Sequence, residues 1–536
     1  MMIKRYFLAT IFAVFLLSML CFAKESINID KAIGETAGFV YETVKEPTVS
    51  SIGGEWVVLG LSRSGVEVPD EYYADYYKRV EEYVKEKKGV LHTKKYTEYS
   101  RVILALSSIG KKPENVAGYN LLSPLGDYEK TIWQGINGPV FALIALDCKN
   151  YDIPKNKDAK TQATREMYVN YILKKQLSDG GWALTGSVSD PDVTAMVLQA
   201  LSNYQNNSKV KTATSKALIC LSNMQNTNGG FSTFGQETSE SSVQVLVALC
   251  SLGIDPQDSR FVKNGKSVLD SVLSYSLEGG AFCHTKNGAT NLMATEQALY
   301  GLVAYKRFSE GKNSLYSMGD AISFTGNKSV QNGLKNKHKD IKKKEIIYVG
   351  KTFGDISSLK TKEKIEALIS RGIINGKTKD TFDPNGKMTR AEFATITIKS
   401  LGLSEKSGSV FSDVKKNDWF YGYVYSAFNY GIIKGVSENR FSPNGTITRE
   451  EAAVMIMRSA SLCGMNTELS KSEVRNILCV FPDYVKASDW SQNALAFCFK
   501  EGIMSDEVSL INPKESVTRK EIAELLYNLL DKAKLL

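Results

Sequence analysis

Phe353-Gly354-Asp355, Phe411-Ser412-Asp413 and Phe481-Pro482-Asp483 each open a segment that closes with Thr389-Arg390-Ala391-Glu392, Thr448-Arg449-Glu450-Glu451 or Thr518-Arg519-Lys520-Glu521. From the aspartate to the arginine the spacing is 35, 36 and 36 residues. Between the two motifs, each segment carries a helical pattern that ends in Gly-Ile-Ile or Gly-Ile-Met. Three copies at so constant a spacing predict a helical repeat that fills residues 353–536.

The Thr-x-x-Glu part of the closing motif is a capping box, in which threonine and glutamate satisfy backbone N–H groups at a helix start. Helix capping alone is the simpler interpretation, but it leaves the arginine unexplained, because a cation in the first turn opposes the helix dipole. The arginine stands at the same register in all three copies. This favours an anion-binding role, in which the guanidinium and the N–H groups of the helix start meet one carboxylate.

This arrangement resembles a triple S-layer homology domain, with repeats at 348–407, 408–471 and 477–536. The resemblance implies a pseudo-threefold helical spindle that binds pyruvylated secondary cell-wall polysaccharide, an anionic polymer, in grooves between three prongs. By register it assigns a ligand-binding arginine and a groove aspartate to each copy, and a groove glycine to the first two. These residues are Arg390, Arg449, Arg519, Asp355, Asp413, Asp483, Gly376 and Gly435.

The three copies differ at the groove. The third has Asp506 in place of the glycine, and a carboxylate there would repel an anionic ligand. We therefore expect the groove that uses Gly435 and Arg449 to be the most intact and the groove near Asp506 to be impaired. The aspartates are suited to accept from sugar hydroxyls or to hold the arginine. Trp419 and Trp490 follow the second and third aspartates, and each either stacks on a sugar face or packs between prongs.

Upstream of these copies, residues 309–347 lose helical periodicity and are rich in lysine, as in Lys335-Asn336-Lys337-His338-Lys339. This composition predicts a solvated linker. The alternative is that its lysines add attraction to an anionic wall.

A second repeat system occupies residues 40–308. A short apolar helix signature recurs six times, and its closing leucines are 45, 40, 55, 48 and 53 residues apart. Such an interval holds two helices and two connections, so six units predict twelve helices in pairs. The signatures end at Leu61, Leu106, Leu146, Leu201, Leu249 and Leu302.

Glycine pairs followed by an aromatic residue mark several connections: Gly180-Gly181-Trp182, Gly229-Gly230-Phe231 and, more loosely, Gly279-Gly280-Ala281-Phe282. Adjacent glycines permit positive φ and close backbone approach, and the aromatic ring is expected to pack between helix pairs. Gln176 and Gln225 each stand four residues before the first glycine. A buried amide at that position is expected to tie one connection to the next.

These motifs resemble those of the terpenoid cyclase and protein prenyltransferase superfamily, which implies an α/α toroid of about six helix pairs. The same toroid also serves as a binding module, so the resemblance predicts the fold more firmly than an activity.

Enzyme chemistry on this toroid would need residues that the sequence supplies only in part. The acidic cyclase motif has Asp190-Pro191-Asp192 but Val193 at the position of its last aspartate. Asp192 capping a helix that Pro191 shapes is the structural alternative. Glu296 is a further candidate and faces either the central cavity or solvent. We therefore predict no catalytic residue and name these acids only as a possible toroid pocket.

Zinc would need more ligands than Cys283-His284 offers, because adjacent residues rarely point at one metal, and only three histidines occur. We expect neither a metal nor another cofactor. A deep apolar cavity around the acids would favour chemistry, and a shallow polar bowl would favour binding.

The ends and the composition place the chain outside the cell. Residues 1–23 have the basic start and apolar run of a signal peptide, whose removal leaves no predicted membrane span. Apart from Cys21 in the signal segment, the seven cysteines fall in apolar helical patterns. They indicate core residues rather than a disulfide framework. The net charge of +9 is modest for 536 residues, and export makes nucleic acid an improbable partner.

The sequence thus predicts an all-α, secreted protein of the bacterial cell wall or S-layer, held there by its C-terminal repeats. Its toroid is expected to bind an unknown ligand or partner. The alternative is a wall-anchored enzyme of terpenoid cyclase or prenyltransferase-like fold that acts on a lipid or glycan.

Overall fold

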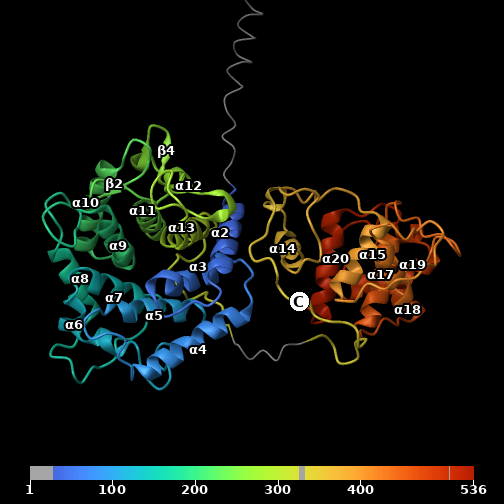
Figure 1. Ribbon diagram of the computed structural model, residues 1–536, viewed down its shortest axis with the longest axis horizontal. Coiled ribbons are helices and arrows are strands. Elements are labelled where there is room, and N and C mark those ends of the chain that lie inside the picture. The colour runs from blue at the N-terminus through green and yellow to red at the C-terminus, as the bar shows by residue number, and fades with distance from the viewer. Residues whose placement is uncertain (1–27, 325–331, 506–507) are drawn as a thin grey trace, which may run out of the picture.

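The structure is a computed structural model that describes residues 28–324, 332–505 and 508–536. The predicted signal segment and Asp506 lie outside these residues. The described chain forms two helical bodies side by side, with α2 of the first facing α14 of the second (Figure 1). The predicted all-α class is confirmed, because the only strands in the described part form two two-residue hairpins. Among these residues no helix is both long and apolar enough to cross a membrane.

The N-terminal body has twelve α-helices in the described part of the chain. They are α2 (Ile29–Thr43), α3 (Trp56–Ser64), α4 (Asp70–Glu86), α5 (Thr97–Ser108), α6 (Tyr128–Ile132), α7 (Asn137–Asp147), α8 (Arg165–Lys174), α9 (Pro191–Leu201), α10 (Ser208–Met224), α11 (Ser239–Ser251), α12 (Val268–Leu273) and α13 (Leu292–Ser309). The two antiparallel hairpins pair β1 (Ser232–Thr233) with β2 (Gln236–Glu237) and β3 (Val262–Lys263) with β4 (Lys266–Ser267). Short π- or 3-10 turns lie at η1 (Ser51–Glu55), η2 (Ser123–Gly126), η3 (Ser202–Tyr204), η4 (Ser259–Phe261) and η5 (Glu278–Gly280).

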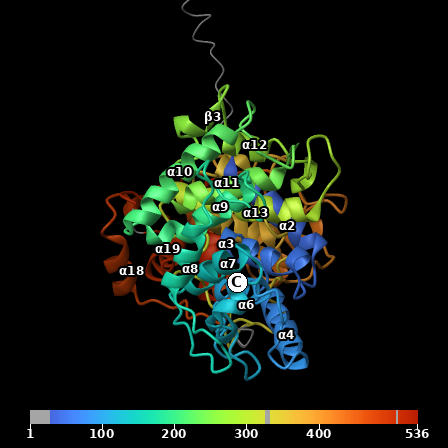
Figure 2. The ribbon, with the colours of Figure 1, turned by 90° about the vertical axis from the view of Figure 1, so that its left-hand side faces the viewer.

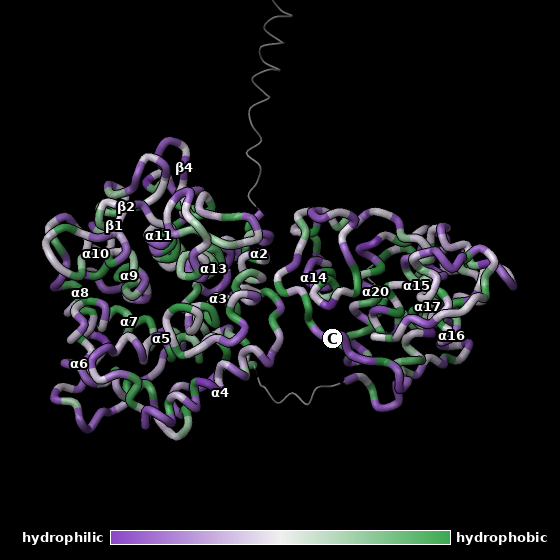
Figure 3. The backbone as a smooth tube through the Cα atoms, viewed as in Figure 1, coloured by the Kyte–Doolittle hydropathy of each residue, from purple (hydrophilic) through white to green (hydrophobic). Residues whose placement is uncertain are grey.

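Six of these helices close into a ring. In the order α3, α5, α7, α9, α11 and α13 each packs against the next, and α13 packs against α3. The other helix of each pair lies outside, as α4, α10 and α12 show at the periphery of Figure 2. The hydropathy of Figure 3 follows this division, with a hydrophobic α9 and a hydrophilic α4. The predicted toroid of six helix pairs is therefore confirmed.

The six predicted signatures fall on the six inner helices, and their middle residue is small for a steric reason. A Cβ on Gly60 would lie 3.0 Å from Leu299 Cδ2, and one on Gly301 would lie 2.8 Å from Val243 Cγ1. Neighbouring inner helices therefore pack across glycine or alanine, and a larger residue would push them apart.

The glycine-pair turns have the predicted form. Gly180 and Gly229 have positive φ, and Trp182 is fully buried and donates from Nε1 to the Ile172 carbonyl at 2.8 Å. The Gln176 amide donates to Gly180 O in its own turn and to Ala213 O on α10. Gln225 repeats this pattern with Gly229 O and Phe261 O. The glutamines thus tie each turn to the next repeat, as predicted.

Both predicted edges of the toroid move outward in the structure. The first helix begins at Ile29 rather than near residue 40 and packs against α13. Beyond residue 308, Leu315 and Met318 are buried in the toroid core. Farther on, Ile341 lies in the core of the C-terminal body. The prediction of a solvated linker at 309–347 missed these three buried residues, because the average composition of a segment does not show single apolar residues that enter a core.

The C-terminal body contains three copies of a helix pair and one added helix. The helices are α14 (Lys362–Ser370) and α15 (Arg390–Ser400), α16 (Tyr421–Asn429) and α17 (Arg449–Leu462), α19 (Asp489–Lys500) and α20 (Arg519–Lys532), with α18 (Lys471–Leu478) between the second and third copies and turns η6 (Gly354–Ile356) and η7 (Tyr484–Lys486). The second helix of each copy packs on the first helix of the next: α15 on α16, α17 on α19, and α20 on α14. This cyclic packing is the predicted pseudo-threefold arrangement.

The two bodies are docked through close backbone contact and buried charge. A Cβ on Gly34 of α2 would lie 2.4 Å from Gly350 O, so only glycine fits there. Asp30 binds Lys306 of the toroid at 2.6 Å and Lys362 of α14 at 2.5 Å. These contacts hold the toroid against the first copy.

Candidate functional site

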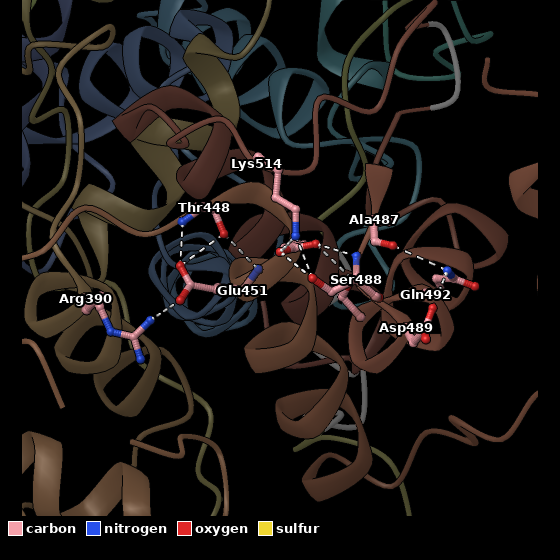
Figure 4. Close-up of polar contacts among 10 residues, drawn as sticks. Arg390, Thr448, Glu451, Ala487, Ser488, Asp489, Gln492 and Lys514 are labelled. Carbon is pink, nitrogen blue, oxygen red and sulfur yellow. Dashed lines mark hydrogen bonds and ion pairs between the residues drawn. The ribbon is translucent and has the colours of Figure 1, made fainter. Parts of the chain in front are cut away.

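The three motif arginines all reach from one copy into the next. Arg390 donates from Nε to Phe441 O at 2.9 Å and from Nη1 to the Glu451 carboxylate at 2.5 Å. Figure 4 shows this contact, with Glu451 also accepting from Thr448. Arg449 donates to the carbonyls of Ile511 and Asn512 and pairs with Glu521, while Arg519 donates to Phe382 O and Asn375 O. The arginine of each copy therefore belongs to a groove with the following copy.

All three capping boxes are present as predicted. Thr389, Thr448 and Thr518 each accept from the backbone N–H of the glutamate three residues on, and that glutamate accepts from the threonine N–H. Two of these glutamates carry a second bond, from the arginine of the preceding copy. The same residue thus caps a helix and neutralises a neighbouring cation.

The motif aspartates hold backbone rather than arginine. Asp413 accepts from the N–H groups of Phe441 and Ser442 at 2.9 and 2.8 Å, and Asp483 accepts from Ile511 and Asn512 in the same way. Burial alone would raise the pKa of Asp413, but these N–H groups outweigh it and lower the pKa.

Asp355 repeats the pattern with Phe382 and Asp383. In each copy, the residue whose N–H binds the aspartate also accepts a hydrogen bond from the motif arginine through its carbonyl. These residues are Phe382, Phe441 and Ile511. The aspartates therefore position the turn that lines the groove, an indirect form of the predicted arginine-holding role.

The groove glycines are required by packing within their own copy. A Cβ on Gly435 would lie 2.3 Å from Ser437 O and 2.8 Å from the Phe411 ring. The Gly435 turn lies in the copy that receives Arg390, whereas Arg449 enters the third copy. The prediction that Gly435 and Arg449 share one groove is therefore wrong. It assumed that a motif and its groove lie in one repeat, whereas the cyclic packing divides each groove between two.

The two predicted tryptophans both lie at the surface. Trp419 is 61% exposed and Trp490 is 59% exposed, which excludes packing between prongs for either ring. Both rings offer a flat apolar face to solvent, as stacking on sugar requires.

Arg519 differs from its two counterparts because no carboxylate pairs with it among the described residues. The equivalent glutamate, Glu392, is held instead by Lys377 at 2.9 Å. The second copy has Val436 at the position of Lys377. Arg519 is 5% exposed and lies over the Phe382 ring, and its Nη1 has no hydrogen bond to any described residue. Burial lowers the pKa of its guanidinium, although Glu392 attracts the charge from farther away.

A cavity of about 440 Å³ lies beside Arg449. Its lining is mostly apolar, from Ile503, Met504 and Leu510, with Glu521 and Glu524 as its acids. The one arginine of this lining is therefore already neutralised by Glu521, and Glu524 is itself held by Lys364 at 2.6 Å.

The candidate acids of the toroid occupy different positions from those predicted. Asp190, and not Asp192, caps α9 by accepting from Val193 N–H at 3.0 Å. Asp192 is half-buried on the first turn, and burial raises its pKa to about 6, although the nearby hydroxyls of Ser241 and Thr233 lower it. Glu296 faces neither cavity nor solvent. It is fully buried, accepts from Gly53 N–H at 3.0 Å, and burial raises its pKa to about 7.

The centre of the toroid is filled. The Trp56 ring of α3 lies 5.8 Å from Tyr300 on α13 and 6.2 Å from Phe141 on α7, across the ring of helices. Gln244 links Gln199 and Tyr300 by hydrogen bonds in the same region. A deep apolar cavity for an isoprenoid is therefore not formed at this level among the described residues.

The Cys283-His284 pair does not converge on one point. Cys283 is buried and its thiol donates to Tyr275 O, whereas His284 pairs through Nδ1 with Glu240 at 2.8 Å. Six of the seven cysteines in the described chain are buried and all seven are free, as predicted, with Cys479 the exposed one.

A known family model matches the C-terminal repeats. The family model described as S-layer homology domain matches residues 352–394 and 410–453, which are the first two copies. The chain therefore contains an S-layer homology domain and is a bacterial cell-surface protein associated with the cell wall. The third copy is joined to these two by the same arginine, aspartate and capping contacts.

Two curated relatives extend the match along the C-terminal body. The chain is 37% identical over 186 residues to the amylopullulanase of Thermoanaerobacterium thermosulfurigenes, which is 34% of this chain and 10% of that protein. It is 30% identical over 166 residues to the surface-layer 125 kDa protein of Lysinibacillus sphaericus, which is 30% of this chain and 13% of that one. The chain thus spans a small part of each relative.

Among solved structures, ent-copalyl diphosphate synthase from Streptomyces platensis is similar at 16% identity and a TM-score of 0.33, over 47% of this chain and 49% of that one.

Proposed function

We propose that the C-terminal body anchors the protein to pyruvylated secondary cell-wall polysaccharide and displays the toroid as a binding module. The anchor acts chiefly through the groove of Arg519 and Lys377. The observation that carries this proposal is that Arg519 alone among the three motif arginines is not paired with a carboxylate in the described chain.

The charge count of the grooves supports this choice. The Arg390 groove contains one arginine and one bound glutamate, and in the Arg449 groove Arg449 is paired with Glu521 and Lys364 with Glu524. In the Arg519 groove, Lys377 binds Glu392 and no carboxylate of the described chain contacts Arg519 directly, while Glu392, Asp383 and Asp355 attract its charge from farther away. An anionic polymer gains most where a desolvated cation lacks an internal partner.

The chemistry of a pyruvyl ketal fits this groove. Its carboxylate accepts two parallel N–H bonds from a guanidinium, and Arg519 keeps Nη1 available while Phe382 O and Asn375 O fix its orientation. A guanidinium held in advance loses little entropy when the ligand binds.

Sedimentation with purified wall sacculi tests this proposal on the full chain. Arg519→Ala is expected to weaken binding at least about tenfold, the cost of a lost charged hydrogen bond. Arg390→Ala and Arg449→Ala are the matched controls and are expected to weaken it less than about threefold, because each removes an arginine that Glu451 or Glu521 already neutralises. Circular dichroism checks that each variant remains folded.

Two outcomes would contradict the proposal. If the protein sedimented equally with intact sacculi and with sacculi stripped of secondary polymer, the polymer would not be its ligand. Loss of binding in Arg449→Ala but not in Arg519→Ala would place the working groove at the second and third copies.

A further inference from the structure

Buried polar atoms without a partner gather at one end of the toroid. Eight of the fourteen such side-chain atoms in the described chain belong to seven residues. Each residue lies just before or in the first turns of an inner helix, and every inner helix supplies at least one. The residues are Glu55, Arg101, Asn137, Asp192, Ser239, Glu240 and Glu296.

We call this end, formed by the N-termini of α3, α5, α7, α9, α11 and α13, the toroid mouth. Unpartnered buried polar groups are rare in folded proteins, so their concentration here requires a cause.

The groups around the mouth are close enough to influence one another. Glu240 is 7% exposed, its Oε2 pairs with His284 at 2.8 Å, and its Oε1 has no partner. Asp192 on the next inner helix is repelled by Glu240. The Glu55 carboxylate lies 3.5 Å from Arg101 Nε on α5. His284 has a side chain that is 42% exposed, so solvent reaches the Glu240 side of the mouth.

The floor below these groups is aromatic and closed. The half-buried Trp56 ring of α3 packs against Phe141 of α7 and Tyr300 of α13 inside the ring of helices. A ligand at the mouth would therefore meet the half-buried Trp56 indole and the carboxylates of Asp192 and Glu240, rather than enter an apolar tunnel.

The unpartnered atoms define the chemistry of the ligand. Glu55 is ion-paired with Arg101 and Glu296 faces no cavity, so the acceptors left for a ligand are oxygens of Asn137, Asp192 and Glu240. The ligand must then be rich in donors and carry no negative charge. An ammonium compound only donates, and Arg101 does not repel it strongly because Glu98 and Glu55 pair with that guanidinium, so the test below includes an amine. A sugar both donates and accepts, and its C–H face stacks on an indole.

We propose that the toroid mouth binds a neutral saccharide, with Asp192 and Glu240 accepting from its hydroxyl groups and Trp56 beneath a sugar ring. This inference rests on the proposed role of the toroid as a binding module and is independent of wall anchoring. The ligand differs in charge from the anionic polymer of the Arg519 groove.

The test uses the full chain on an array of neutral oligosaccharides from chitin, xylan, mannan and α-glucan. The wild-type chain and Arg519→Ala are expected to bind at least one of them equally. Asp192→Asn and Glu240→Gln are each expected to weaken that binding about tenfold. Both replacements keep the shape of the side chain, and thermal unfolding checks that the toroid is intact.

Three results would overturn the inference: no array saccharide bound, binding unchanged in both mouth variants, or tighter binding of spermidine at the same residues. Sedimentation with sacculi in parallel separates this outcome from a failure of anchoring. Asp192→Asn and Glu240→Gln are expected to sediment like the wild type, because neither residue lies in the C-terminal body.

Discussion

Both bodies of this protein are repeats of helix pairs that close into a ring, but they differ in how they satisfy their polar groups. In the C-terminal body, each motif arginine bonds to the next copy, and Arg390 and Arg449 meet a carboxylate from inside the protein. In the toroid, the Gln176 and Gln225 amides each donate to two carbonyls, yet the helix starts leave single carboxylate oxygens such as Glu240 Oε1 without a hydrogen bond. The difference teaches that the repeated motifs mainly build the rings, whereas the departures from them mark candidate ligand sites.

The largest expected effect tests the toroid motif. Trp182→Ala should lower the free energy of unfolding of the toroid by roughly 3–5 kcal/mol, because the ring is fully buried and its indole N–H is bonded. Urea denaturation of the full chain measures this loss. Trp133→Ala is the control, because that ring is 58% exposed and should change stability by less than about 0.5 kcal/mol. A cost below about 1 kcal/mol for Trp182→Ala would contradict the structural role of the motif.

A second prediction separates the bodies by pH. Burial raises the pKa of Glu296 to about 7, so its proton is held more tightly in the folded toroid than in the unfolded chain. The stability this provides is present below the unfolded pKa and is lost as pH rises through about 7. We expect the loss to be about 3 kcal/mol between pH 4.5, the ordinary pKa of a glutamate carboxyl, and pH 7.

The C-terminal body should show the opposite slope. Glu521 and Asp413 have lowered pKa values, because bonds from Thr518 and from backbone N–H groups outweigh burial. Their contribution is present above the unfolded pKa and is lost as pH falls below about 4. Denaturant midpoints of the two transitions across pH check both signs. Glu296→Gln should reduce the slope of the toroid, to which the raised pKa values of Glu55 and Asp192 also contribute, and leave the slope of the C-terminal body unchanged. Parallel slopes in the two bodies would contradict the assignment.

A third prediction compares equivalent aspartates. Asp483→Ala should destabilise the C-terminal body by about 3 kcal/mol, since it leaves two N–H groups of Ile511 and Asn512 without their charged acceptor. Asp355→Ala removes the same pair of bonds at an exposed position, so about 1 kcal/mol is expected. Guanidinium denaturation gives both values. Equal losses would mean that burial does not control the strength of this clamp.

Much of the fold could be predicted from the sequence, because each helix is marked by a short motif that recurs at a regular spacing. The six apolar signatures became the six inner helices, and the Thr-x-x-Glu boxes became helix starts. The docking of α2 against the C-terminal body could not be predicted in this way. It depends on Gly34 and Gly350, which are 316 residues apart and are separate in any local pattern.

The site was harder to predict because its geometry crosses copies. Register alone identified the three arginines, but it placed Arg449 with Gly435 when the cyclic packing places Arg390 there. The position of Lys377 could have been found from the sequence, since this lysine follows the groove glycine of the first copy where the second copy has Val436. Glu240 carried none, because nothing in the sequence shows that it is buried with one oxygen unpartnered.

The smallest expected effect tests the difference between the grooves. Lys377→Val copies the second repeat into the first and releases Glu392, which then pairs with Arg519 as Glu451 pairs with Arg390. Wall binding should fall about threefold, the scale of one surface ion pair. The reciprocal change, Val436→Lys, should draw Glu451 away from Arg390 and raise binding by a similar factor. Sacculus titrations at low and high salt measure both, and both changes should shrink as salt rises. If the two variants moved affinity in the same direction, the pairing of Lys377 with Glu392 would not be what distinguishes the Arg519 groove.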